Sequence, residues 1–204
     1  MSDTATPLLC LASASPRRTQ LLAQLGVAHR VAVADLDETL LPGESAADYV
    51  QRMARTKALA VRARDATLPV LAADTTVVID GQVCGKPRDA ADGLAMLGRL
   101  SGRTHQVLTA VALAGAAGLG LRLSASEVRF RALTRAECLA YWHSGEPRDK
   151  AGGYAVQGRA AAFIEHLSGS YSGVMGLPLY ETAQLLEAAG IALWPATAGG
   201  GGAA

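Results

Sequence analysis

The stretch PVLAADTTVVIDG, residues 69–81, gives the strongest indication of the fold. From residue 69 to 79 it is nearly continuously apolar, which is typical of a strand buried inside a sheet. It then reaches Asp80–Gly81, a pair that favours the two-residue turn of a β-hairpin because both residues tolerate positive φ. The stretch therefore predicts a buried strand that turns back on itself.

Helical and strand patterns alternate on both sides of this strand. The alternation predicts an α/β fold in which helices cover a mixed sheet. No internal repeat or long linker divides the sequence, so we expect one domain over residues 1–195 and a disordered Gly/Ala tail over 196–204. The other expected elements are a strand at 8–13, a helix from Pro16 to about Leu25, a strand at 29–36, a helix from Ser45 to about Arg64, a helix over about 89–100, strands over about 104–114 and 120–131, a helix capped by Thr134 and Glu137, a strand near AAAFIEHL (160–167) and a last helix over about 178–189.

The composition narrows the classes of function. Half of the 204 residues are hydrophobic and only 4% are aromatic, so the core must be built mainly from Ala, Leu and Val. A net charge of +1, without a long run of one sign, argues against a nucleic-acid-binding surface. The three cysteines lack CxxC spacing and the four histidines lack metal-ligand spacing, so neither a zinc site nor a disulfide framework is expected.

The sequence carries no sign of export or membrane insertion. The N-terminal residues MSDTATPLL lack the basic and apolar regions of a signal peptide. No stretch reaches the roughly 18 uninterrupted apolar residues of a membrane span. We therefore expect a soluble cytoplasmic protein.

Several charged residues interrupt stretches that are otherwise apolar. Asp74 lies inside the predicted strand, and it is either a paired structural residue or a metal ligand or general base at the rim of a cleft. Lys57 shares a helical stripe with apolar residues, so its ammonium group either snorkels to water or points into a polar cavity. Lys86, which precedes a proline, and Glu38, in a polar loop, are either exposed surface residues or part of the same site.

The stretch SASPRRTQLL, residues 13–22, raises an electrostatic question. Ser15 and Pro16 favour a helix that begins here, which places Arg17 and Arg18 at the positive end of its dipole. Cations are disfavoured there by about 0.3–1 kcal/mol each. The two arginines either reach away from the helix end or bind an anion together with the free N–H groups of the first turn.

The loop SGEPRDKAGGY, residues 144–154, places four charged residues among three glycines next to Gln157–Gly158. It is either solvated surface or a loop that faces a substrate. Together, the two arginines, the two lysines and the carboxylates indicate phosphate chemistry, with basic groups for phosphate oxygens and carboxylates for a divalent metal. The sequence has no Walker A, Rossmann glycine or GxSxG motif, so the usual nucleotide-binding and hydrolase motifs do not apply.

Six stretches, which run in order from Leu11 to Leu179, resemble the Maf family of nucleoside triphosphate pyrophosphatases: LASASPRRTQLLAQLG, YVQRMARTKA, AADTTVVIDGQVCGKP, MLGRLSGRTHQVLTAV, SGEPRDKAGGYAVQG and GSYSGVMGLPL. The resemblance implies an elongated mixed sheet with helices and two lobes around a central cleft, a fold related to inosine triphosphate pyrophosphatases. It also implies hydrolysis between the α- and β-phosphates of a nucleotide, which gives a monophosphate and pyrophosphate, and it suggests a homodimer.

The family's motifs also imply roles for single residues. Asp74 is the expected proton acceptor, and Glu38 is expected to lie in the cleft. From the position of Asp74 and the basic cluster we further expect Glu38 and Asp74 to hold Mg or Mn. The stretch SGEPRDKAGGYAVQG resembles the branch that acts on dTTP and UTP, in which Arg17, Thr75 and Gln157 tune the choice of substrate. The residues expected to line the triphosphate site are Ser13, Arg17, Arg18, Lys57 and Lys86.

A second function is compatible with the same resemblance. The chain could be a nucleotide-binding regulator of septum formation and cell division that does not turn its nucleotide over. The presence of Asp74 and the lysines argues for the enzyme, whose expected role is to remove modified pyrimidine nucleotides before they are incorporated. Departures from the family pattern are mild: Ala155 and Val156 replace the commoner Gly and Ile, and Gly173 stands where Asn is frequent.

Overall fold

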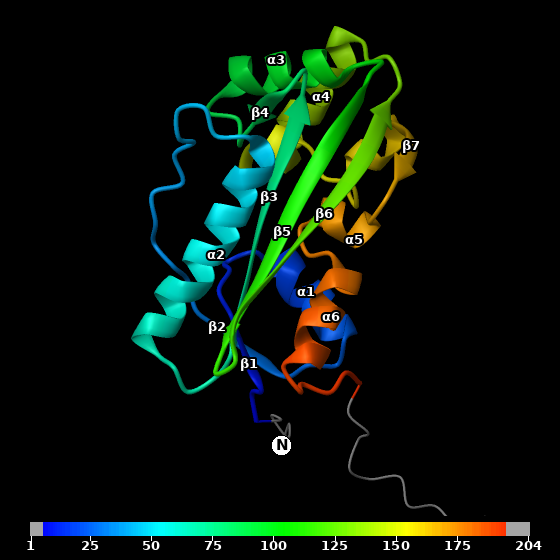
Figure 1. Cartoon of the computed structure of the whole chain (residues 1–204). Helices are drawn as coiled ribbons and strands as arrows, with labels where there is room; N and C mark the ends of the chain where they lie inside the picture. Colours follow the sequence, from blue (N-terminus) through cyan, green and yellow to red (C-terminus); the bar gives the residue numbers. More distant parts are fainter. Residues whose placement is uncertain (1–5, 195–204) are drawn as a thin grey trace, which may run out of the picture.

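The computed structural model describes residues 6–194, so the tail predicted at 196–204 lies outside the described residues. The described chain is elongated and is built around one mixed seven-stranded sheet (Figure 1). The strands follow the order β2-β1-β3-β5-β6-β7, and β4 pairs with β3. Their bounds are β1 (Leu9–Leu11), β2 (His29–Val31), β3 (Val70–Ile79), β4 (Gln82–Cys84), β5 (Thr104–Gly115), β6 (Gly118–Phe130) and β7 (Ile164–Ser168).

The strand predicted from PVLAADTTVVIDG forms the middle of this sheet. It is β3, which pairs with β5 along nearly its whole length, and β5 continues into an antiparallel ladder with β6. The predicted hairpin is confirmed, because Ile79 pairs with Gln82 and both turn residues have positive φ, 54° at Asp80 and 71° at Gly81. Two positive φ values are the signature of a type I′ turn.

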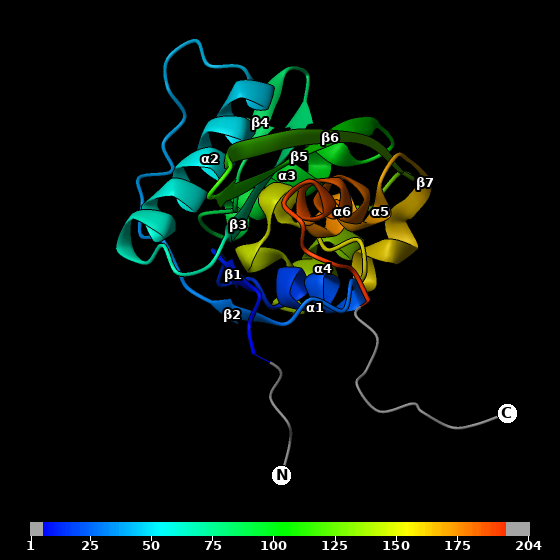
Figure 2. The same cartoon turned by 60° about the horizontal axis from the view of Figure 1, so that its bottom comes forward.

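Helices cover both faces of the sheet. Helix α2 lies on one face, whereas α1, α5 and α6 lie on the other (Figure 2). Helices α3 and α4 lie at the end of the sheet where the β3–β4 hairpin turns (Figure 1). No helix in residues 6–194 is long and apolar enough to cross a membrane. The bounds are α1 (Pro16–Gln24), α2 (Ala46–Arg64), α3 (Ala90–Leu100), α4 (Arg135–His143), α5 (Tyr171–Met175) and α6 (Leu179–Ala188).

The predicted helix starts are confirmed where side chains cap the backbone. The Ser45 hydroxyl accepts a hydrogen bond from the Asp48 amide at 3.1 Å. Thr134 and Glu137 bond each other's backbone reciprocally and form a capping box. Ser15 stands at the N-cap of α1, but its side chain makes no capping hydrogen bond.

The face of the sheet opposite α2 carries two separate hydrophobic clusters. Leu71 and Ala73 of β3 belong to the terminal cluster, which comprises Leu9, Leu11, Leu21, Leu22, Leu25, Val27, Leu71, Ala73, Val111, Leu113, Leu177, Leu185 and Leu186. Val77 and Ile79, farther along the same face, belong to the hairpin cluster, which comprises Val77, Ile79, Cys84, Leu97, Leu100, Val107, Val128, Phe130, Cys138, Tyr141, Tyr154, Val156, Ala160 and Phe163.

A row of hydroxyl side chains separates the two clusters. Thr75 of β3 pairs with Thr109 of β5, which pairs in turn with Ser124 of β6. Strand residues alternate between faces, so these three residues share the face of the two clusters. We call Thr75, Thr109 and Ser124 the polar row. It interrupts the core across three strands, and this interruption gives the molecule two apolar halves.

Two strand predictions in the N-terminal part were too long. The strand expected at 29–36 is only His29–Val31, and the strand expected at 8–13 ends at Leu11. After Leu11 the chain turns toward α1. The Ala32 amide donates to the Leu11 carbonyl at 3.0 Å, and beyond this bond the edge strand β2 loses its partner β1. A strand that has no ladder left to bond to ends there.

Other elements differ from the pattern or were not predicted. The stretch AAAFIEHL begins as a 3₁₀ helix over Arg159–Phe163 and becomes a strand only at Ile164. The five-residue α5 was not predicted, and the hairpin prediction gave no bounds for the three-residue returning strand β4, because segments this short carry too few repeats to establish a period.

Candidate active site

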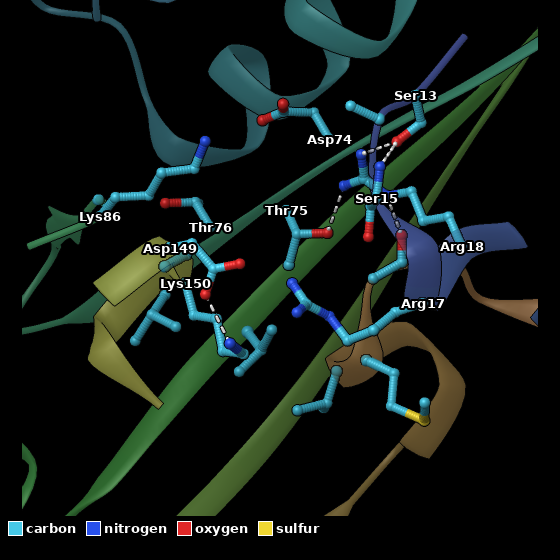
Figure 3. A pocket seen from close by; sticks show the side chains of 18 of the residues that line it. Ser13, Ser15, Arg17, Arg18, Asp74, Thr75, Thr76, Lys86, Asp149 and Lys150 are labelled. Atoms are coloured by element: carbon cyan, nitrogen blue, oxygen red, sulfur yellow. Dashed lines mark hydrogen bonds and ion pairs between the residues drawn. The ribbon is translucent and has the colours of Figure 1, made fainter. Parts of the chain in front are cut away.

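The site is a cleft of about 580 Å³ that opens beside the middle of β3 (Figure 3). The cause is a gap in the pairing along one edge of this strand. β1 pairs with β3 only at Val70 and Leu71, and β4 pairs with it only from Val77 onward. Between these points the described strands leave one edge of β3 open, while β5 bonds the other edge.

The segments that follow the two short strands, β1 and β4, lie at this gap. After β1 the chain enters the stretch with Ser13, Arg17 and Arg18, and after β4 it passes through Lys86. All nine residues that the sequence analysis singled out line this one cleft: Ser13, Arg17, Arg18, Glu38, Lys57, Asp74, Thr75, Lys86 and Gln157. Residues from six separate segments of the sequence are thus brought together, and their roles remain predictions.

A lysine between two carboxylates occupies the α2 side of the cleft. Lys57 Nζ lies 2.6 Å from Asp74 Oδ1 and 2.7 Å from Glu38 Oε1. The Lys57 ammonium therefore points into the cleft, which decides between the two orientations that the helical stripe allowed. Asp74 is a paired carboxylate, as one of the two interpretations required, and it also faces the cleft.

Burial makes the two carboxylates unequal. The Asp74 side chain is 9% exposed and the Glu38 side chain 46%. Burial raises the pKa of Asp74 above its ordinary value, and the charges of Lys57 and Arg18 offset this only in part. Burial also pushes the pKa of Glu38 upward, but the hydrogen bond and charge of Lys57, with the charges of Lys86 and Arg18, outweigh it and lower that pKa.

The Arg18 guanidinium donates three hydrogen bonds to the residues around it. Its Nε donates to the Gly176 carbonyl at 2.7 Å, and its two terminal nitrogens donate to Ser13 Oγ and Thr75 Oγ1, each at 3.2 Å. Burial lowers the pKa of this guanidinium. Arg18 therefore ties the start of α1 to β3 and to the end of α5, and it orients two hydroxyls at the cleft.

The polar row continues this network away from the cleft. The hydroxyls of Thr75 and Thr109 lie 3.0 Å apart, and Thr109 Oγ1 donates to the Gly173 carbonyl at 2.8 Å. Because a carbonyl can only accept, the single Thr109 proton is best used there, and the Thr75 proton then points to Thr109. Thr75 is thus fixed from both sides, because its oxygen accepts from Arg18 and its proton is donated to Thr109.

Arg17 and Lys86 are cations of the site that no side chain of the described residues engages. In residues 6–194, no ion pair or side-chain hydrogen bond engages the Arg17 guanidinium or the Lys86 ammonium. Figure 3 shows the two side chains reaching into the pocket from opposite sides. Arg17 lies in the first turn of α1, where the first N–H groups of a helix have no intrahelical partner. This arrangement suits an anion between them.

The charged loop contributes only half of its charged residues to the cleft. It folds into two short 3₁₀ turns, Glu146–Asp149 and Ala151–Gly153. Asp149 and Lys150 line the cleft (Figure 3). Glu146 instead hydrogen-bonds the neighbouring segment, and the Arg148 guanidinium lies 5.8 Å from the centre of the Trp142 ring.

Sequence reasoning passed over Tyr49, Thr76 and Tyr154, which also line the cleft. The Tyr49 hydroxyl donates to the Glu38 carbonyl at 3.0 Å, and burial with the nearby carboxylates raises its pKa to about 12. Tyr49 thereby fixes the loop that carries Glu38. Thr76 lies two residues after Asp74 and shares its face of β3, so the two-residue period of a strand could have identified it.

The donor set of the cleft fits a hard divalent cation. Among residues 6–194 there is no group of three His, Cys, Asp or Glu side chains that could enclose a metal ion. The two carboxylates that converge on Lys57 match the other common arrangement, in which Mg²⁺ is bound by one or two carboxylates, substrate phosphates and water. Glu38 and Asp74 are therefore chemically suited to share such an ion with a bound phosphate.

Comparison with known proteins places the chain in a family. A family model described as Maf-like protein matches residues 8–189. The chain belongs to the Maf family. The resemblance in the six stretches is thereby confirmed, and the match reaches beyond them at both ends.

Relatives of this Maf chain are similar over most of their length. A protein of Hahella chejuensis named dTTP/UTP pyrophosphatase is 52% identical over 189 residues, which cover 91% of this chain and 94% of that protein. A protein of Bordetella parapertussis with the same name is 55% identical over 196 residues, which cover 92% and 95%. The Ham1 protein of Staphylococcus aureus aligns with a TM-score of 0.44 and 14% identity over 60% of this chain and 71% of that chain, a likeness too small to carry an argument.

Proposed function

We propose that this protein hydrolyses dTTP and UTP between the α- and β-phosphates and releases the nucleoside monophosphate and pyrophosphate. The proposal is supported by the family, by the names of relatives more than half identical to the chain, and by the contents of the cleft. One observation carries it above the others. The carboxylate of Asp74 is buried, paired with Lys57, and open to a cleft that also holds the unpaired cations Arg17 and Lys86.

Asp74 acts as the general base in this proposal. It accepts a proton from the attacking water while the oxygen of that water forms a bond to the α-phosphorus, and the bond to the bridging oxygen breaks. A base works best when its pKa lies near the working pH, and burial moves the Asp74 pKa in that direction. Lys57 holds the carboxylate in place through the 2.6 Å contact and favours its ionised form.

The cations stabilise the charge that accumulates on the departing pyrophosphate. Arg17 and Lys86 approach the pocket from opposite sides, so a polyphosphate chain between them would contact both. Lys57 has three N–H donors, of which the two carboxylates take two, so one donor is left for a phosphate oxygen. Arg18 keeps Ser13 and Thr75 oriented toward the same space.

Glu38 and Asp74 are the residues that would hold a divalent cation together with phosphate oxygens. Such an ion, Mg²⁺ or Mn²⁺, would supply Lewis acidity at the phosphoryl group. The carboxylates themselves contribute negative charge at the one place in the cleft where Lys57 already compensates it. This explains why a phosphate-binding cleft can contain two carboxylates.

In this proposal the base is selected at the wall of the cleft opposite Glu38 and Asp74. Gln157 is exposed to the cleft and offers a donor and an acceptor, which suits the O4–N3 edge of uracil or thymine. With Thr75 and Arg17 it forms the proposed set of specificity residues. A free β3 edge on one side and the 145–157 loop on the other then contact the two ends of the nucleotide.

The test is pyrophosphate release by the purified protein with Mg²⁺ or Mn²⁺, across dTTP, UTP, CTP, GTP and 7-methyl-GTP. We expect release from dTTP and UTP, with the monophosphate as the other product. Preference for 7-methyl-GTP would keep the reaction and contradict the base selection. Binding without release would contradict the reaction and favour the nucleotide-binding regulator instead. The expected homodimer is tested separately by light scattering.

A further inference from the structure

Glu146 uses its carboxylate to hold a segment of backbone and not to face the cleft. Its Oε2 accepts a hydrogen bond from the Arg159 amide at 3.0 Å. Its Oε1 accepts from the Tyr141 hydroxyl at 2.7 Å and, at 3.5 Å, from the Ala160 amide. Both oxygens of one carboxylate are therefore engaged, chiefly by donors that belong to the start of the 159–163 turn.

The other side of the same segment is held through Tyr141. Its hydroxyl donates to Glu146 and accepts from the Ala155 amide at 3.1 Å. Ala155 is 5% exposed, so this amide has no access to bulk water and depends on the tyrosine. Glu146 and Tyr141 thus hold residues 155 and 159–160, which lie on both sides of Gln157.

Gly158 shows how tightly the carboxylate is packed. A Cβ atom at this position would lie 2.3 Å from Glu146 Oε1 and 2.5 Å from Oε2. Such contacts are too short for any side chain, so the carboxylate and the backbone next to Gln157 approach each other only because residue 158 is glycine. The contact leaves little freedom for the backbone that carries Gln157.

The same residue also reaches the other cleft-lining part of the loop. The Glu146 carbonyl accepts from Lys150 Nζ at 2.8 Å, and Lys150 lines the cleft. The Gln157 side chain, by contrast, has no hydrogen bond within residues 6–194 and is exposed to the cleft. Its position therefore depends on its backbone, which Glu146 and Tyr141 hold on both sides, together with the hydrogen bond from the Gly158 amide to the Ala155 carbonyl.

We propose that Glu146, with Tyr141, is a positioning residue for base selection, which holds the 155–160 backbone so that Gln157 presents its amide to the base. This inference rests on the proposed function for the role of Gln157. Glu146 lies outside the cleft lining, so it acts through the segment and does not contact the nucleotide. Its loss is expected to weaken recognition of the base and leave the chemistry at Asp74 nearly intact.

Glu146→Gln is the most specific test of this role. It keeps the shape, but its amide nitrogen is a donor, and whichever way it turns it faces another donor, either the Arg159 amide or the Tyr141 hydroxyl with the Ala160 amide. Glu187→Gln is the matched control, because Glu187 is exposed on α6 and away from the cleft. Tyr141→Phe provides a second variant that removes the Ala155 contact.

The experiment combines two measurements on wild type, Glu146→Gln, Tyr141→Phe, Gln157→Ala, the Glu146→Gln/Gln157→Ala double variant and the control Glu187→Gln, which is expected to match wild type in both. Hydrogen exchange followed by mass spectrometry reports on residues 155–160, and pyrophosphate release gives kcat and KM for dTTP and dCTP. We expect faster exchange of this segment in Glu146→Gln and in Tyr141→Phe. We also expect the dTTP-over-dCTP ratio of kcat/KM to fall about tenfold in Glu146→Gln, mainly through KM, with kcat within about threefold.

The double variant separates positioning from a general structural effect. If Glu146 acts through Gln157, the double variant has nearly the same ratio as Gln157→Ala alone, because neighbouring effects on one interaction are not additive. Unchanged exchange in Glu146→Gln, an unchanged ratio, or an additive double variant would each overturn the proposal. If the wild type hydrolyses no nucleotide, the proposed function fails, and faster exchange would then reduce Glu146 to a structural role.

Discussion

The two hydrophobic clusters on one face of the sheet are built in different ways. The hairpin cluster uses residues 77–163, in which neighbouring strands follow each other along the chain and pair antiparallel. The terminal cluster joins residues 9–27 to residues 177–186 across β3 and β5, and its first strand, β1, pairs with β3 in parallel. Met175 of α5 packs against both, directly above the boundary.

The difference explains where the site lies. At the boundary, the polar row replaces apolar side chains with hydroxyls, so neither cluster extends across it. β1 and β4, one from each half, pair with opposite ends of β3 and leave its middle open. The cleft is therefore a consequence of joining two halves along one strand, and variants at the boundary and inside one half should behave differently.

The largest effect is expected at the boundary, from Asp74→Asn. Loss of the base should lower kcat by about 10³-fold or more, which pyrophosphate release with dTTP measures. The fold should remain, since the amide fits the same space. The pKa of Asp74 is raised in the folded protein, so the ionised carboxylate costs stability above that pKa, and the variant should gain stability relative to wild type as the pH rises. Turnover close to wild type would contradict the assignment.

Arg17 and Arg18 should differ although they are neighbours. Arg17→Ala removes an unpaired cation and should lower kcat/KM about 10²-fold without lowering the melting temperature. Arg18→Ala breaks three hydrogen bonds, which join α1 to Ser13, to β3 and to the end of α5, so it should also destabilise the fold by about 2 kcal/mol. Thermal melts and pyrophosphate release compare the two, with Arg122→Ala at an exposed position of β6 as control. Equal melting temperatures would contradict the distinction.

Gly93→Ala tests the hairpin half alone. Its Cβ would lie 2.3 Å from Trp142 Cζ3, and a buried indole ring cannot easily move, so we expect a loss of about 2 kcal/mol in unfolding free energy. Gly98→Ala in the same helix meets nothing within 4 Å and should be neutral or stabilising by about 0.5–1 kcal/mol. Denaturant melts give both values. The folded fraction of Gly93→Ala should keep wild-type kcat/KM, and a catalytic defect would contradict the independence of the halves.

The smallest effects are expected in the pH profile, and their signs are opposite. The positive charge of Lys57 lowers the pKa of Asp74 and the negative charge of Glu38 raises it. Lys57→Met should therefore move the acidic limb of kcat/KM to higher pH, and Glu38→Gln should move it to lower pH. Both variants lose activity, so the position of the limb is compared and not its height. Shifts in the same direction would contradict Asp74 as the titrating base.

Local patterns sufficed where the interacting residues are close in the sequence. The β3–β4 turn, the caps of α2 and α4 and the antiparallel β5–β6 pair follow from a few adjacent residues, whose conformational preferences act over the same short range. Six of the nine site residues are polar or charged residues that interrupt the local pattern, the motifs of the Maf family added the others and all the roles, and the structure brings the nine into one cleft.

The tertiary structure decided what depends on distant partners. Asp74 and Thr75 interrupt the apolar pattern of β3, but no local pattern shows that one edge of the strand is open there; it is open because β1 ends at Leu11 and β4 ends at Cys84. Glu146 and Lys150 have similar local surroundings in the loop, but backbone amides from residues 159–160 draw one away from the cleft while the other lines it. Hydrogen-bond partners and burial far along the chain determine such choices, and their free energies exceed the small local preferences that a sequence pattern reveals.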